Sequence, residues 1–215
     1  MTFATMLEQM STGMLRTVGI FVLTLIFSMP LGMLVAFARM SKNRIIKNIA
    51  RIYISVLRGT PLMLQLLVVY FAPFYIWGAN IGGYRFAAVI IGFALNYAAY
   101  FAEIYRGGIE SIPKGQYEAA AVLGYTKSQT FMRIVLPQVA KNIMPAVTNE
   151  VITLVKDTSL AFTLAYQEVF TIGKQIAAAQ TSFMPFVIAG VFYYIANAVV
   201  AFVMEIFEKK MNYYR

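Results

Sequence analysis

The stretch EAAAVLGYTKSQTFMRIVLPQ, residues Glu118–Gln138, is a polar segment in a chain that is otherwise filled with long apolar runs. One apolar run precedes it at about Phe86–Tyr105, and another follows it at about Pro145–Tyr166. A helix needs about 20 mostly apolar residues to cross a bilayer, and both runs meet this requirement. The sequence therefore predicts two membrane spans with a polar, partly helical segment between them, outside the bilayer.

The composition of the whole chain supports the same interpretation. Of its 215 residues, 60% are hydrophobic and only 13% are charged, and the mean hydropathy is +0.69, which indicates an integral membrane protein. The chain contains no Cys and no His, so disulfides, haem ligation, thiolate or imidazole metal sites and His-dependent nucleophiles are excluded. We therefore expect a protein that is not an enzyme, with no catalytic residues and no metal site.

Five segments have the length and apolar character of transmembrane helices. No Lys or Arg precedes Arg16, and the first apolar run is too long for the core of a signal peptide, so we expect it to be a span. The sequence thus predicts an all-α membrane protein with about five spans in one transmembrane domain, residues 1–215. The predicted spans are about Gly13–Ala38, Pro61–Trp77 with its flanks, Phe86–Tyr105, Pro145–Tyr166 and Pro185–Phe207.

The positive charges predict how these spans are oriented. The formal net charge is +9, and the basic residues lie mainly in the connectors after the first and third spans, where they indicate the cytoplasmic side rather than nucleic-acid binding. We therefore expect an N-terminus outside and a C-terminus in the cytoplasm. The basic residues concerned are Arg39, Lys42, Arg44, Lys47 and Arg51, then Arg106, Lys114, Lys127, Arg133 and Lys141, and at the C-terminus Lys209, Lys210 and Arg215.

The first basic connector has the pattern of an amphipathic helix suited to the inner membrane surface. It leads into RGTPLMLQ, residues Arg58–Gln65, where Thr60 can cap a helix that begins at Pro61. We expect an elbow here, with the second span beginning at Pro61. A basic stretch that only fixes the topology would explain the charges but not the Thr-Pro start. The apolar residues at helical spacing are Ile45, Ile49, Ile52 and Val56.

The segment between the third and fourth spans is predicted to contain two short helices. Residues 115–123 include good helix formers, and Gly124 is placed to end the helix in a left-handed turn. A second helix is predicted over 127–136, where Pro137 stops or bends it before the next span. Glu118 lies near the start of the first helix, where the helix dipole favours its charge, and the small Ala side chains let another protein approach closely.

The spacing within this segment resembles the cytoplasmic motif of ABC importer permeases: EAA, three residues, Gly, nine residues, Ile, one residue, Leu-Pro. RGTPLMLQ, NYAAYFAEIYRGGI at Asn96–Ile109 and KDTSL at Lys156–Leu160 are similar to the polar amino acid uptake branch of these permeases, of the histidine, arginine or glutamine type. The resemblance implies a coupling helix that docks into a cleft of a separate ATPase subunit. The motif positions are Glu118, Ala119, Ala120, Gly124, Ile134, Leu136 and Pro137.

The nucleotide chemistry is expected to reside in that other chain. GYTKS at Gly124–Ser128 is superficially similar to the end of a phosphate-binding loop, but Thr126 stands where the motif needs a glycine before Lys127. No Gly-rich loop after a strand precedes it. We therefore expect no cofactor in this chain, with ATP and Mg²⁺ bound by the partner ATPase.

Polar residues inside the predicted spans are candidates for a transport path, because ionisable groups in a bilayer are costly. A zwitterionic amino acid needs acceptors for its ammonium group, for which Glu150 and Asn96 are candidates, and a donor for its carboxylate, for which Lys156 is the candidate. Lys156 and Asp157 cannot face each other across a regular helix turn, so either each has another partner or the helix is interrupted there. Packing between spans is the alternative role. The candidate path residues are Gln65, Asn96, Glu150, Thr153, Lys156 and Asp157.

The resemblance also implies a mechanism and a set of partners in a bacterial cell membrane. Two permease subunits, identical or related, would form the path, two ATPase subunits would dock beneath, and an extracytoplasmic amino-acid-binding protein would deliver the substrate. Nucleotide binding would then rock the spans between inward-facing and outward-facing states. One alternative is a transporter or channel driven by an ion gradient, with Glu103, Glu150 or Asp157 as ion sites, although no inverted repeat is evident. The other alternative is a membrane scaffold that transports nothing.

Overall fold

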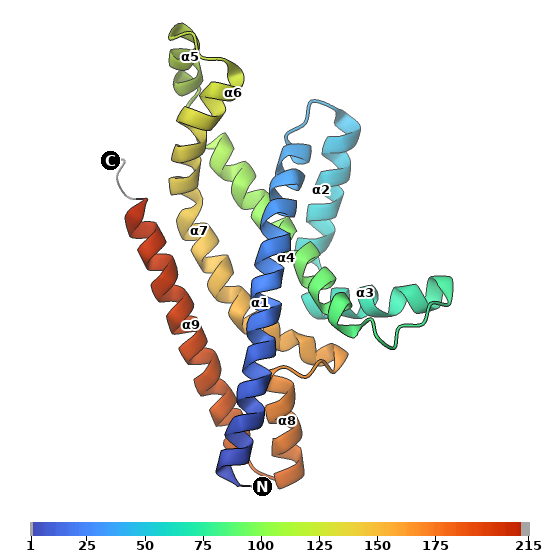
Figure 1. The fold of residues 1–215 in the computed structure, drawn as a ribbon. Coiled ribbons are helices and arrows are strands. Elements are labelled where there is room, and N and C mark those ends of the chain that lie inside the picture. The colour runs from blue at the N-terminus through green and yellow to red at the C-terminus, as the bar shows by residue number, and fades with distance from the viewer. Residues whose placement is uncertain (1, 212–215) are drawn as a thin grey trace.

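The structure is a computed structural model that describes residues 2–211, and these residues are helical almost throughout (Figure 1). No strand occurs among them, which confirms the all-α prediction. The N-terminus and α8 lie at one end of an elongated bundle, and α5 and α6 lie at the other end. The helices are α1 (Phe3–Arg39), α2 (Arg44–Gly59), α3 (Leu62–Trp77), α4 (Arg85–Glu110), α5 (Lys114–Val122), α6 (Lys127–Thr130), α7 (Leu136–Asp157), α8 (Val169–Gln180) and α9 (Met184–Lys210).

Three of the five predicted spans lie in helices that could cross a membrane. Within residues 2–211, α1, α4 and α9 are each long and apolar enough, and the bent pair α2–α3 qualifies together as a fourth. The remaining predicted span, about Pro145–Tyr166, is divided between α7 and a 3₁₀ turn at Thr158–Leu164. Polar residues such as Asn149 and Glu150 lower the hydropathy of α7. Arg215, one of the predicted cytoplasmic basic residues, lies outside the described residues.

The elbow predicted at Thr60 and Pro61 is present between α2 and α3. α2 and α3 meet at 113°, and α2 packs against α1 and α4. Tyr53 of α2 donates a hydrogen bond from Oη to the Leu95 carbonyl oxygen of α4 at 2.6 Å. Thr60 does not cap α3, because its Oγ1 donates to the Val56 carbonyl of the preceding helix at 2.8 Å. Pro61 takes the cap position without a side-chain hydrogen bond.

Small residues let α1 and α4 pack closely together. Gly32 of α1 lies against α4, so that a Cβ atom at this position would be 2.8 Å from the Phe101 Cβ and 3.0 Å from the Ala98 carbonyl oxygen. Ala98 and Phe101 are themselves fully buried. Between helices in a bilayer, association depends on such van der Waals packing, because lipid tails are as apolar as the side chains. This contact holds α4, which carries Asn96, against the longest helix of the fold.

We expect Gly32→Val to destabilise the protein by about 1–3 kcal/mol, because the added atoms have no space between the two helices. Gly19→Val is the matched control on the same helix, since no atom of another helix lies within 4 Å of the Cβ position there. Thermal unfolding of the purified protein, followed by circular dichroism, measures both. Equal melting temperatures in the two variants would contradict the close approach of α1 and α4.

Candidate functional site

A polar cavity of about 210 Å³ lies where the break between α2 and α3 meets α4 and α7. Drug-sized ligands occupy pockets of about 300–1,000 Å³, so this cavity suits a smaller molecule. Four of the six candidate path residues line it, namely Asn96, Glu150, Thr153 and Asp157. The other lining residues are Thr60, Leu62, Tyr97 and Tyr100.

Two carboxylates, Glu150 and Asp157, determine the charge of this cavity. They lie seven residues apart in α7, which places them two turns apart on one face of the helix. Tyr97 donates a hydrogen bond from Oη to Asp157 Oδ2 at 2.7 Å and thereby fixes the orientation of that carboxylate. Sequence reasoning missed Tyr97, because a tyrosine in an apolar run also serves as a packing residue. The cavity therefore offers two acceptors for positive charge.

Gln65 and Asn96 satisfy backbone carbonyls that the helix break leaves without helical partners. Gln65 Nε2 donates to the carbonyl oxygens of Leu57 at 2.9 Å and of Thr60 at 3.0 Å. Asn96 Nδ2 donates to the Leu57 carbonyl oxygen at 3.1 Å and to Gln65 Oε1 at 2.9 Å. Both hydrogens of the Asn96 amide are thus used, so Asn96 can offer the cavity only its oxygen. Gln65 is not among the residues that line the cavity, so its role here is to hydrogen-bond the carbonyls at the break.

We expect Gln65→Leu to destabilise the protein by about 1–3 kcal/mol, because the carbonyls of Leu57 and Thr60 lose a donor that a leucine cannot replace. Gln175→Leu provides the control, since Gln175 is exposed on α8 and surface changes usually stay within about 0.5 kcal/mol. Denaturant unfolding in detergent compares the two variants. A loss in Gln65→Leu no larger than in Gln175→Leu would show that water replaces the glutamine at the break.

The structure does not bring Lys156 to the cavity. Lys156 is exposed, whereas the next residue, Asp157, lines the cavity. Successive residues of a helix with 3.6 residues per turn point about 100° apart, and here Asp157 faces the cavity whereas Lys156 does not. The donor for a substrate carboxylate predicted at Lys156 is therefore not found in this position.

Of the two alternatives for Lys156 and Asp157, the interruption of the helix is present, and Asp157 also has a partner in Tyr97. α7 ends at Asp157, and the 3₁₀ turn Thr158–Leu164 follows directly. Thr158 Oγ1 donates to the Val155 carbonyl oxygen at 2.6 Å, and the Ser159 hydroxyl donates to another carbonyl of the last turn at 2.8 Å. These side chains compete for backbone groups at the helix end, as residues of their type do. The polar stripe of α7 therefore ends within the cavity.

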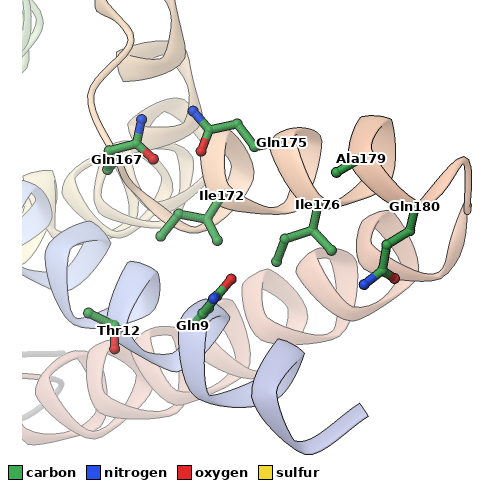
Figure 2. Close-up of a pocket in the computed structure, with 8 residues that line it drawn as sticks. All are labelled: Gln9, Thr12, Gln167, Ile172, Gln175, Ile176, Ala179 and Gln180. Carbon is green, nitrogen blue, oxygen red and sulfur yellow. The ribbon is translucent and has the colours of Figure 1, made fainter. Parts of the chain in front are cut away.

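A larger cavity of about 670 Å³ lies near the N-terminus, between α1 and α8 (Figure 2). Four of the side chains around it are the amides of Gln9, Gln167, Gln175 and Gln180. Among the described residues that line it, none is ionisable, and none is a predicted path residue. It cannot neutralise the charges of a zwitterion, and for this reason the smaller cavity is the candidate site.

The predicted turn at Gly124 is present at the opposite end of the molecule. Gly124 has a φ of +77°, in the left-handed region that glycine adopts without strain. The Tyr125 amide donates to the Ala120 carbonyl oxygen at 3.0 Å, and the Gly124 amide donates to the Ala121 carbonyl oxygen at 3.0 Å. These two bonds form the helix end called a Schellman motif. They turn the chain sharply after α5.

The surface of α5 beside this turn exposes apolar side chains. Val122 is 88% exposed and Leu123 is 73% exposed, and Glu118 and Ala119 also lie on the surface. Ala120 points inward and is only 1% exposed, so it packs the helix against its neighbours. Exposed apolar groups that lie together mark a contact surface. The segment thus presents a small apolar patch next to an acidic residue.

Of the two outcomes predicted at Pro137, a stop or a bend, the structure excludes the stop. α6, a π turn at Phe131–Val135 and α7 follow one another without interruption, and Pro137 lies in the first turn of α7. A proline ring clashes with the carbonyl four residues earlier, here that of Arg133, and this carbonyl belongs to the wider π turn. The π turn therefore accommodates the proline. Ile134 and Leu136 are half-buried in this region.

Residues 28–213 match the family model described as binding-protein-dependent transport system inner membrane component. The chain is 39% identical over 201 residues to a Rickettsia felis protein named as a glutamine transport system permease, GlnP, and the match covers 93% of this chain and 91% of that protein. It is 38% identical over 201 residues to the arginine transport system permease protein ArtQ of Bacillus subtilis, again with 93% and 91% coverage.

The fold agrees with these sequence relationships. A solved structure described as an amino acid ABC transporter with histidines matches this structure with a TM-score of 0.87. The match covers 98% of this chain and 99% of that chain, at 30% sequence identity. The chain therefore belongs to the family of binding-protein-dependent transport system inner membrane components, and it is a membrane permease subunit of an ABC importer.

Proposed function

We propose that this permease imports polar amino acids and that the cavity between α2, α3, α4 and α7 holds the substrate in transit. The observation that carries the proposal is the presence of Glu150 and Asp157 in one cavity. Ionisable residues within membrane helices mark substrate pathways because they are costly to keep there. One carboxylate suffices for an α-ammonium group, so the second favours a cationic side chain such as that of arginine or histidine. Relatives named for glutamine and arginine transport support a polar amino acid.

The orientation proposed for the permease follows from its charges. The end of the bundle with α5 and α6 is basic and is assigned to the cytoplasm. The chain then crosses the membrane five times, through α1, the pair α2–α3, α4, α7 with its 3₁₀ turn, and α9. This assignment places the N-terminus outside and the C-terminus in the cytoplasm.

The apolar patch of Val122 and Leu123, together with Glu118, is proposed to dock into the ATPase subunit, which binds ATP and Mg²⁺. A second permease subunit completes the path, and an extracytoplasmic binding protein delivers the amino acid at the end where α8 lies. α6 and the π turn continue directly into α7. When the docking segment moves, this continuous helical path moves with it and displaces Glu150 and Asp157. Such a rigid-body motion can produce alternating access.

Reconstitution tests this function. The permease, its ATPase and its binding protein are incorporated into liposomes, and the uptake of labelled L-arginine is measured with ATP inside. Uptake that requires both ATP and the ATPase supports the proposal. Uptake by the permease chain alone, driven by a proton or sodium gradient, would instead identify a gradient-driven transporter. The absence of uptake for any polar amino acid would reject the substrate assignment.

A further inference from the structure

A zwitterionic substrate carries a carboxylate, and the side chains that line the cavity include two carboxylates but no cation to neutralise it. Glu150 and Asp157 are acceptors when ionised, and the amide hydrogens of Asn96 are used at the helix break. Lys156, the only cation predicted for this role, is exposed away from the cavity. The hydroxyls of Thr153 and Tyr100 can donate to a carboxylate, but only a cation at the cavity would also neutralise its charge.

Arg58 lies at the rim of the cavity. It belongs to the last turn of α2, two residues before the lining residue Thr60. Its guanidinium carbon is 5.1 Å from the centre of the ring of Tyr100, which is also a lining residue. The guanidinium thus lies beside the cavity.

The guanidinium of Arg58 is available to a ligand. In the part of the chain that the structure describes, the ion pairs involve Arg106 and Lys209, and Arg58 engages in none of them. Its side chain is exposed and rests on the Tyr100 ring. A cation at membrane depth is costly unless an anion compensates it, and a substrate carboxylate is such an anion.

We propose that Arg58 binds the α-carboxylate of the substrate, an inference that rests on the proposed function of the cavity as an amino acid site. A guanidinium matches a carboxylate with two parallel hydrogen bonds, which a lysine ammonium does not reproduce. The Tyr100 ring positions the guanidinium through a cation–π contact. Glu150 and Asp157 then remain for the ammonium group and for a cationic side chain.

The test measures binding to the purified complex of permease and ATPase in nanodiscs, with L-arginine and with L-argininamide, in which an uncharged amide replaces the carboxylate. The wild-type complex should bind L-arginine about 10- to 100-fold more tightly, because a hydrogen bond to a charged group contributes about 1.5–3 kcal/mol. Arg58→Gln should weaken L-arginine binding by a similar factor and leave L-argininamide binding nearly unchanged. Arg58→Lys should retain part of the discrimination.

Arg51→Gln is the matched control. Arg51 lies seven residues earlier in α2, on the same face of the helix and about 10 Å toward the basic end. It should keep the full preference for L-arginine. The proposal would be overturned if Arg58→Gln kept the full preference for L-arginine over L-argininamide. It would also be overturned if the wild-type complex bound both compounds equally well. The second result does not depend on whether a variant folds. A wild-type complex that binds neither compound would reject the amino acid site itself.

Discussion

Asp157→Asn should reduce the uptake of L-arginine by about 30-fold or more. The substitution keeps an acceptor for the Tyr97 hydroxyl, which donates to Asp157 Oδ2 at 2.7 Å, and removes only the negative charge. Loss of one partner from a desolvated charge pair costs about 2–5 kcal/mol, and about 1.4 kcal/mol corresponds to a factor of ten. Initial uptake rates in proteoliposomes that contain the complete transporter measure the effect. Asp157→Glu, which restores the charge, should recover part of the rate.

Glu150→Gln provides the comparison that assigns the two carboxylates. The carboxylate that binds the α-ammonium group serves every amino acid, whereas the one that faces the side chain serves only cationic amino acids. Competition by L-citrulline, an uncharged analogue of arginine, separates these roles in a binding assay. The variant that loses L-arginine binding but keeps L-citrulline binding has lost the side-chain contact. Wild-type uptake in both Asp157→Asn and Glu150→Gln would leave the two residues with a role in packing alone.

The apolar helices of this fold are predictable from local sequence, because the need for about 20 apolar residues acts on each segment separately. The predicted spans at Gly13–Ala38, Phe86–Tyr105 and Pro185–Phe207 lie inside α1, α4 and α9. The elbow at Pro61 is also visible in the sequence. The angle of 113° between α2 and α3 cannot be predicted from the sequence. It depends on the packing of α2 against α1 and α4 and on the amides of Gln65 and Asn96.

The candidate site, like the fold, can be predicted only in part from the sequence. Glu150 and Asp157 are visible in the sequence because an ionisable residue in an apolar run has a cost that needs an explanation. Sequence spacing cannot decide whether Lys156 or Asp157 faces the cavity, since both belong to the same helix turn. The roles of Tyr97 and Arg58 depend on contacts between helices that are distant in the chain. Their residue types alone fit packing and membrane topology equally well.

Gly124→Asp should abolish ATP-driven uptake while leaving membrane insertion intact. Gly124 has a φ of +77°, where a side chain adds strain of about 1–2 kcal/mol. The new charge would lie beside Val122 and Leu123, which are 88% and 73% exposed and form the proposed docking surface. An unpaired charge buried in an interface costs several kcal/mol, so the ATPase should no longer copurify with the permease. Glu118→Arg should have the same effect by reversing a charge on that surface.

Gly115→Asp makes the same chemical change at the other end of α5. Its Cβ position is open and its backbone is not left-handed, and the N-terminal end of a helix favours a negative charge. Uptake should therefore be retained. Wild-type transport in both Gly124→Asp and Glu118→Arg would refute the docking role of this segment. Because the polar cavity lies far along α7 from α5, L-arginine should still bind to Gly124→Asp. Binding without uptake would separate the coupling surface from the substrate site.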